Sequence, residues 1–320
     1  MPGRNRGTWS SRVSFIGNWS YPLCSLIAMG LTPLISAEWN WRVQLLIPAI
    51  LSLIATALAW RYFPESPRWL ESRGRYQEAE KVMRSIEEGV IRQTGKPLPP
   101  VVIADDGKAP QAVPYSALLT GVLLKRVILG SCVLIAMNVV QYTLINWLPT
   151  IFMTQGINLK DSIVLNTMSM FGAPFGIFIA MLVMDKIPRK TMGVGLLILI
   201  AVLGYIYSLQ TSMLLITLIG FFLITFVYMY VCYASAVYVP EIWPTEAKLR
   251  GSGLANAVGR ISGIAAPYAV AVLLSSYGVT GVCILLGAVS IIVAIAIASI
   301  GSETKGVSVE SLSIDSVANK

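Results

Sequence analysis

The sequence predicts an all-α membrane protein, and three observations support that prediction. Of its 320 residues 55% are hydrophobic and only 12% are charged, well below the roughly 25% charged residues of a typical soluble domain. The apolar residues fall into long runs without charge, each long enough for a helix to cross the hydrocarbon core. Lysine and arginine gather in the segments on one side of these runs, as in multi-spanning membrane proteins.

Eight membrane spans can be drawn from the charge-free runs. They cover about residues 13–37, 43–60, 127–152, 162–184, 191–209, 213–239, 252–276 and 279–300. The first run is too long for the apolar core of a signal peptide and a second follows at once, so we interpret it as a span. No charge lies between Lys190 and Glu241, an interval too long for one helix, so we expect a turn at residues 210–212.

A charged stretch separates the second and third spans. Residues 68–92 carry an apolar stripe at helical spacing, which predicts a helix outside the membrane. Residues 95–114 are rich in Pro, Gly and Asp and are expected to form a linker, followed by a short amphipathic helix over 115–125. The predicted domains are therefore 1–63 with two spans, the loop 64–126, 127–301 with six spans, and the tail 302–320.

The distribution of basic residues predicts the orientation of the chain. With eight spans and a cytoplasmic amino terminus, the outside segments hold only Arg42 and Lys160 of the 24 lysines and arginines. This bias follows the positive-inside rule and predicts that both termini and the long loop are cytoplasmic. It also explains the net charge of +8 as a membrane feature, so we expect no nucleic-acid partner.

The composition excludes most catalytic and metal chemistry. The sequence has no histidine, the commonest metal ligand and general base, and its four cysteines lie in apolar runs without paired spacing. It contains no phosphate-binding loop and no nucleophile–base arrangement. We therefore expect no enzyme activity, no cofactor and no metal site.

One arginine lies inside a predicted span. Arg260 is about 13 Å along the helix axis from Gly251, where the apolar run begins. A charge at that depth is costly in hydrocarbon and should face protein or a water-filled cavity. Two interpretations follow: Arg260 is a structurally paired or snorkelling side chain, or it is a cation on a substrate path.

Polar residues mark one face of the third span. Asn138, Gln141 or Tyr142, and Asn146 recur three to four residues apart, so they share a helical face. Lipid offers amides no partner, so this face should turn toward a substrate cavity or a neighbouring helix. The candidate substrate-binding residues are Arg260, Asn138, Gln141, Tyr142, Asn146, Tyr228, Tyr233 and Asn18.

Several short segments resemble those of major facilitator superfamily transporters, in the branch of sugar porters and organic-ion (aromatic-acid) transporters. They are residues 64–70 (PESPRWL), 185–190 (DKIPRK), 240–251 (PEIWPTEAKLRG) and 259–263 (GRISG) followed by Pro267. The segment at 185–190 departs from the family pattern, because Met181 and Pro188 replace two glycines. Within this branch the sequence resembles the bacterial inner-membrane metabolite transport proteins.

The resemblance implies a function. Members of the family move small metabolites by alternating access, and the intact members couple transport to protons, so we expect a monomeric transporter in the lipid bilayer of the inner membrane. Arg260 would help to bind an anionic, carboxylated substrate, whether a sugar acid or an aromatic acid; a neutral sugar is the alternative. Symport, antiport and uniport all remain open.

The resemblance also implies a cytoplasmic ion cluster that closes the inward gate. Its candidate members are Asp185, Arg189, Glu241 and Arg250, with Glu65 and Arg68 in the loop after the second span. Positive-inside anchoring of these charges, without any gate, is the alternative.

An internal repeat predicts which helices of the family are present. Residues 2–7 echo 244–251, and residues 64–68 echo 302–306, so the first two spans correspond to the last two. We therefore expect about eight of twelve helices, with 1–63 forming the end of the amino-terminal half and the first four helices lacking. No carboxylate lies inside a span, so the proton-coupling acids would also be lacking. A truncated membrane fragment that does not transport is the alternative to a transporter.

Overall fold

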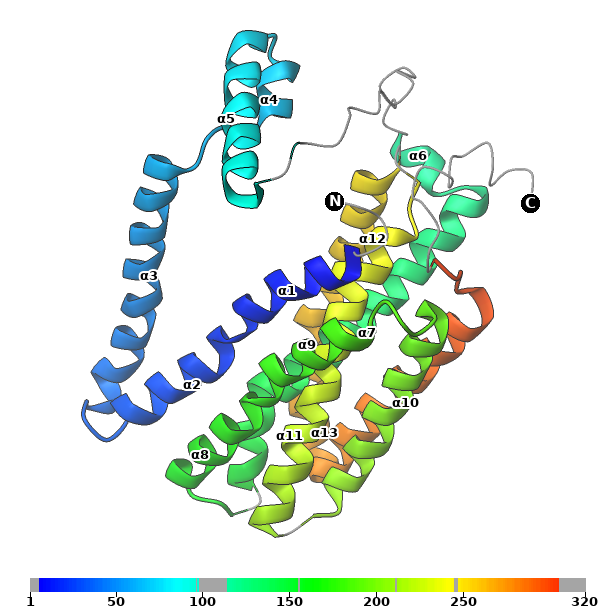
Figure 1. Cartoon of the computed structure of the whole chain (residues 1–320). Helices are drawn as coiled ribbons and strands as arrows, with labels where there is room; N and C mark the ends of the chain where they lie inside the picture. The colour runs from blue at the N-terminus through cyan, green and yellow to red at the C-terminus, as the bar shows by residue number, and fades with distance from the viewer. Residues whose placement is uncertain are drawn as a thin grey trace. The chain divides into compact units, whose positions relative to one another are not determined.

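The computed structural model describes residues 6–95, 97, 114–154, 156–210, 212–244 and 247–304. Within these ranges the chain forms helices and no strand (Figure 1). Helices satisfy their own backbone hydrogen bonds, which lipid cannot do for them, so long apolar runs fold in this way. The predicted all-α membrane fold is confirmed.

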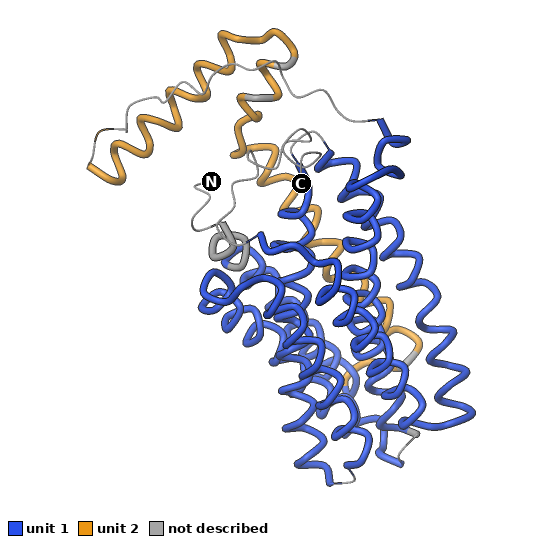
Figure 2. The backbone as a smooth tube through the Cα atoms, turned by 90° about the vertical axis from the view of Figure 1, so that its right-hand side faces the viewer, with its two compact units in different colours: residues 1–33, 110–320 blue, residues 34–109 orange. Residues whose placement is uncertain are grey.

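The described helices form two compact units, which Figure 2 colours separately. Unit 2 contains α3 (Ala37–Tyr62), α4 (Pro67–Ser72) and α5 (Tyr76–Thr94). Unit 1 contains the other described helices: α1 (Arg6–Asn18), α2 (Ser20–Leu31), α6 (Tyr115–Leu118), α7 (Gly121–Thr154), α8 (Leu159–Met170), α9 (Gly172–Val183), α10 (Arg189–Ser208), α11 (Met213–Val231), the π-helix η2 (Cys232–Tyr238), α12 (Val239–Glu241) and α13 (Lys248–Ile300). The division into domains 1–63, 64–126, 127–301 and 302–320 stays a prediction.

Proline divides two of the predicted spans into pairs of shorter helices. The span predicted over 13–37 becomes α1 and α2, which meet at Trp19, three residues before Pro22. In the same way α8 and α9 meet at Phe171, three residues before Pro174. Proline has no N–H to donate to the carbonyl four residues earlier, which fits both breaks. Proline alone does not decide them, because α3, α7 and α13 continue past Pro48, Pro149 and Pro267.

The predicted spans are all found as helices. Those long and apolar enough to cross a membrane, among the described residues, are Glu38–Tyr62, Gly121–Met153, Leu159–Val183, Arg189–Ser208, Met213–Glu241 and Lys248–Ile300. The last range holds two spans, because Gly278 (φ 64°, ψ −157°) lies outside the helical region at the predicted boundary. A positive φ of this kind is readily adopted by glycine. The segment α1–α2 is not among these ranges, so six ranges are found in the described part of the chain and the count of eight spans stays a prediction.

Unit 1 is built around α7, α10, α11 and α13. The first half of α13 packs along α7, and its second half lies beside α10; α9 packs against α11, and α1 lies along α9. The largest fully buried side chains are aromatic and come from α11, η2 and the segment after α12: Tyr228, Tyr230, Tyr233, Tyr238 and Trp243.

Unit 2 combines an apolar helix with a charged helical hairpin. The most apolar stretch of α3 has none of its residues buried within the structure. A turn at Gly74 joins α4 to α5, and Leu70 and Ala79 are buried between them. The helical pattern predicted over 68–92 is thus found as two helices. The predicted linker 95–114 lies almost entirely outside the described residues, and α6 covers the start of the helix predicted over 115–125.

Candidate functional site

Two glycines bring α13 against the polar face of α7. A Cβ placed on Gly259 would lie 2.9 Å from Cβ of Leu134 and 3.0 Å from Nδ2 of Asn138. One turn further, a Cβ on Gly263 would lie 3.0 Å from the ring of Tyr142. Close approach of this kind is the usual role of small residues in membrane helices. It places the side chains of α7 beside the helix that carries Arg260.

Arg260 is exposed on α13, between these two glycines. Its Nη1 donates a hydrogen bond to the hydroxyl of Tyr142. Among the residues that the structure describes, no carboxylate forms an ion pair with it. A guanidinium has five N–H donors, so one hydroxyl leaves most of its capacity for water or a ligand.

The other predicted residues of α7 differ in how far their polar atoms are satisfied. Asn138 is buried and donates from Nδ2 to the carbonyl of Leu134 at 2.7 Å, whereas its buried Oδ1 has no partner among the described residues. Gln141 donates a long hydrogen bond of 3.5 Å to the hydroxyl of Tyr21. Asn146 is exposed one turn beyond Tyr142. The face predicted from spacing therefore runs from a buried amide to an exposed one.

Tyr21 of α2 is a member of this group that the sequence did not indicate as a site residue. Its ring packs edge-on against Tyr228 of α11, with the ring centroids 5.0 Å apart. Together with its contact to Gln141, this brings three helices distant in sequence to one place. Its only sequence signal was its position near Asn18, in a polar stretch of the first span.

In the described part of the chain, two further predicted substrate residues do not hydrogen-bond to Arg260 or to the polar residues of α7. Asn18 donates to the carbonyl of Ser14 at 2.6 Å, within its own helix. Tyr233 stacks on Tyr238, with centroids 5.1 Å apart, and a Cβ on Gly193 of α10 would touch its hydroxyl. Tyr233 thus packs against the helix that begins at Arg189 and away from the Arg260 group.

Arg189 is the centre of a second polar cluster. The residue is 4% exposed, and its side chain donates from Nε and Nη2 to the two carboxylate oxygens of Glu241, at 3.0 and 3.2 Å. Nη2 also donates to Asp185 at 3.2 Å, and Nη1 donates to the carbonyl of Met184. A bidentate guanidinium–carboxylate pair is the strongest of the common side-chain hydrogen-bond arrangements.

Residues after α13 complete this cluster. The carboxylate of Glu303 accepts from the backbone N–H groups of Arg189 (2.8 Å) and Lys190 (3.2 Å), and so caps the amino terminus of α10. Thr304 donates to Glu241 at 2.8 Å. We call Arg189, Asp185, Glu241, Glu303 and Thr304 the Arg189 cluster. Glu303 and Thr304 were noted only as an echo of residues 64–68, and no local signal pairs them with α10.

The remaining predicted gate residues are Arg250 in unit 1 and Glu65 and Arg68 in unit 2. The guanidinium of Arg250 lies over the ring of Tyr115, 5.2 Å from its centroid. Glu65 is exposed just before α4, and Arg68 is a residue of α4; both belong to unit 2. The structure therefore brings together Asp185, Arg189 and Glu241 of the predicted set.

A π-helix connects the two polar regions. Tyr228 lies on α11 just before η2, and Tyr233 and Tyr238 lie within it. A π-helical turn shifts the register of the side chains that follow it, and such turns are frequent at functional sites. After η2, Glu241 at the end of α12 reaches Arg189, a contact of residues 52 apart in the chain.

The fold and these two polar regions define a multi-spanning helical membrane protein with an arginine available inside a span. The sequence model of the Major Facilitator Superfamily matches residues 1–267, and the chain belongs to this family. It is 99% identical over all 320 residues to YdjK of Escherichia coli (strain K12), whose name describes a candidate metabolite transport protein, and spans 70% of that protein.

A second relative and a solved structure agree with this assignment. The chain is 44% identical to the inner membrane metabolite transport protein YdjE of the same organism, over 98% of this chain and 69% of that one. The proton:xylose symporter XylE, solved with 6-bromo-6-deoxy-D-glucose, has the same fold, with a TM-score of 0.65 and 21% identity; the match covers 97% of this chain and 67% of XylE. These relatives are transporters, and no catalytic family is indicated.

Proposed function

We propose that this protein transports a small carboxylated metabolite across the inner membrane, and that Arg260 binds the carboxylate. The observation that carries the proposal is the contrast between the depth of Arg260 in its span and its single hydroxyl partner. An arginine is costly in this position unless a counter-charge or water compensates it, and a carboxylate fits its planar donors bidentately. Transport of metabolites is also the activity named for YdjK and YdjE.

The residues around Arg260 suit the rest of such a substrate. Tyr142 is held by Arg260 and keeps a lone pair for a substrate hydroxyl, and Asn138 offers a buried acceptor, its Oδ1. Gln141 and Asn146 add amides on the same helix. In this proposal Tyr228 and Tyr21 shape the apolar wall, whereas Asn18 and Tyr233 serve packing.

We assign the Arg189 cluster a mechanical role in the same process. It ties together the end of α9, the start of α10, α12 and the segment after α13. These ends would then move as one body when the halves rock, while Arg250, Glu65 and Arg68 supply ion pairs that form and break at the inward gate.

Orientation, coupling and oligomeric state complete the proposal. Both termini lie in the cytoplasm, as the positive-inside bias predicts, and the transporter acts as a monomer. In the intact family member transport is coupled to protons, and the acids for this step would lie outside the described spans, because the carboxylates of these spans lie only near helix ends. Uptake that is unchanged by a protonophore would contradict the coupling without affecting the assignment of Arg260.

The experiment that tests the substrate class compares matched ligands. Purified protein in lipid nanodiscs is titrated with aromatic and sugar carboxylic acids and with their neutral amides or alcohols. We expect the affinity for an acid to fall about 10- to 100-fold in Arg260→Ala and by less in Arg260→Lys. Lysine keeps the positive charge but lacks the paired N–H donors of the guanidinium. A neutral sugar that binds equally well to wild type and Arg260→Ala would favour a neutral-sugar porter instead.

Transport itself is tested in cells that make either this chain or full-length YdjK, with uptake of the bound acid measured in both. Uptake by both proteins supports the proposal for the chain as given. If only YdjK takes up the acid, and this chain does not bind it either, the result would favour a fragment that inserts into the membrane without transporting.

A further inference from the structure

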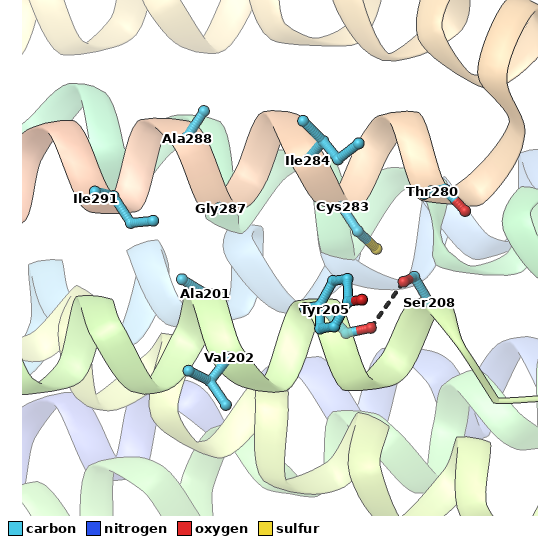
Figure 3. Close-up of a pocket in the computed structure, with 10 residues that line it drawn as sticks. All are labelled: Ala201, Val202, Tyr205, Ser208, Thr280, Cys283, Ile284, Gly287, Ala288 and Ile291. Carbon is cyan, nitrogen blue, oxygen red and sulfur yellow. Dashed lines mark hydrogen bonds between the residues drawn. The ribbon is translucent and has the colours of Figure 1, made fainter.

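A groove lies on the outer face of unit 1, between α10 and the second half of α13 (Figure 3). Its volume is about 460 Å³, within the range of small-molecule sites. Small residues leave the space: Ala201 on α10, and Gly287 and Ala288 on α13. A Cβ built on Gly287 would meet no atom within 4 Å, so the space in front of it is open.

The lining changes from apolar to polar along the groove. Figure 3 shows the hydroxyls of Tyr205, Ser208 and Thr280 and the thiol of Cys283 at one end, and only hydrocarbon side chains at the other. Ser208 donates to the carbonyl of Tyr205 at 2.7 Å, which leaves its oxygen free to accept. None of the described residues that line the groove is charged. Such a gradient fits a molecule with a hydrocarbon tail joined to an uncharged polar group.

The position of the polar end matches the depth of a lipid's ester groups. Ser208 is the last residue of the 20-residue helix α10, so it lies roughly 30 Å from Arg189, about the thickness of the hydrocarbon core. Tyr205 is 61% exposed there, as expected of tyrosine at the membrane interface. The polar end thus lies at the interface opposite the Arg189 cluster.

The length of the groove matches one leaflet. From Thr280 to Ile291 it follows α13 for about 16 Å, roughly half of the hydrocarbon core. Ile284 and Ile291 form its rim and are 63% and 50% exposed, so the groove opens toward the surroundings of the helix bundle.

We propose that this groove binds one phospholipid of the leaflet opposite the Arg189 cluster. Its acyl chain lies over Ala201, Gly287 and Ala288, and its ester carbonyls accept hydrogen bonds from Tyr205 and Thr280. Because the lining carries no charge, the site recognises the acyl and ester part of the lipid and not its headgroup.

The test uses the full chain, purified in mild detergent and examined by native mass spectrometry with added phosphatidylethanolamine or phosphatidylglycerol. Wild type is expected to keep one lipid of either kind through a delipidating wash. Gly287→Leu fills the groove and should lose that lipid. Gly195→Leu is the matched control, since Gly195 is also a helical glycine with open space around its Cβ but does not line the groove, and it should behave as wild type.

A second variant keeps the result interpretable if Gly287→Leu folds poorly. Ala201→Leu fills the same groove from α10 and should also lose the retained lipid, while the far-ultraviolet helical signal is unchanged. Retention of the lipid by both variants would overturn the proposal. A wild-type dimer that both variants abolish would also overturn it, because a helix of a second copy would then occupy the groove. Retention of phosphatidylglycerol alone would overturn it as well.

Discussion

Two arginines of the same bundle have opposite environments. Arg189 is 4% exposed and reaches two carboxylates and a backbone carbonyl, whereas Arg260 is exposed and reaches one tyrosine hydroxyl. An arginine whose donors are used by the protein holds helices together. One whose donors are largely unused inside a span is available for a ligand. The difference in partners, and not the residue type, separates a structural from a functional assignment.

The largest effect should come from breaking the Arg189 cluster. Arg189→Ala leaves Glu241 and Asp185 without their shared counter-charge, and removing one partner of a buried ion pair costs about 3–5 kcal/mol. We expect that loss in the free energy of unfolding, measured by denaturant titration in mixed micelles. Lys190→Ala removes the same charge one residue further and should change stability by less than about 1 kcal/mol. Equal free energies of unfolding for Arg189→Ala and Lys190→Ala would contradict the structural assignment of Arg189.

Arg260 should show the reverse pattern. Arg260→Ala is expected to leave the free energy of unfolding within about 1 kcal/mol of wild type, because it frees only the Tyr142 hydroxyl. Carboxylate binding should weaken by about 1.5–3 kcal/mol, the contribution of a hydrogen bond to a charged group. Tyr142→Phe, measured by the same two assays, should weaken binding less than Arg260→Ala. A variant Arg260→Ala that unfolds as easily as Arg189→Ala would make Arg260 structural.

These two arginines also show how far the sequence could predict the molecule. The spans followed from runs without charge, whereas the break near Pro22 was not predicted, since other helices of the chain continue past an internal proline. The depth of Arg260 in its run was likewise a local property. What its guanidinium contacts was not, because Tyr142 lies 118 residues away and is brought near by the packing of two glycines.

The Arg189 cluster shows the same limit more sharply. Asp185 lies within one turn of Arg189, and Glu241 was a candidate by resemblance. Glu303, 114 residues from Arg189, could not be found from spacing. Arg250 was also a candidate member of the cluster by resemblance, and its guanidinium lies over the ring of Tyr115. Local patterns place residues on helices; contacts between distant helices depend on packing that these patterns do not contain.

The cap on α10 should have an intermediate effect. Glu303→Ala removes an acceptor from two backbone N–H groups at a helix start, where loss of a cap costs about 1 kcal/mol. Thr304→Val removes one hydrogen bond to Glu241 and should cost about as much or less. Both are measured by unfolding in micelles. If Glu303→Ala matched Arg189→Ala instead, Glu303 would be as central to the cluster as the guanidinium itself.

The smallest effect concerns Arg250, the predicted gate residue outside the Arg189 cluster. A cation over an aromatic ring at an exposed site contributes about 0.5–1 kcal/mol. Single variants would mix this term with the other contacts of Arg250, so Arg250→Ala, Tyr115→Leu and the double variant form a cycle that isolates the pair. We expect a coupling of about 0.5 kcal/mol between Arg250 and Tyr115 in the free energy of unfolding. A coupling in transport rate with none in stability would instead place Arg250 at the gate. A contact that forms only in a sparsely populated state changes the rate of rocking and has little effect on the stability of the folded protein.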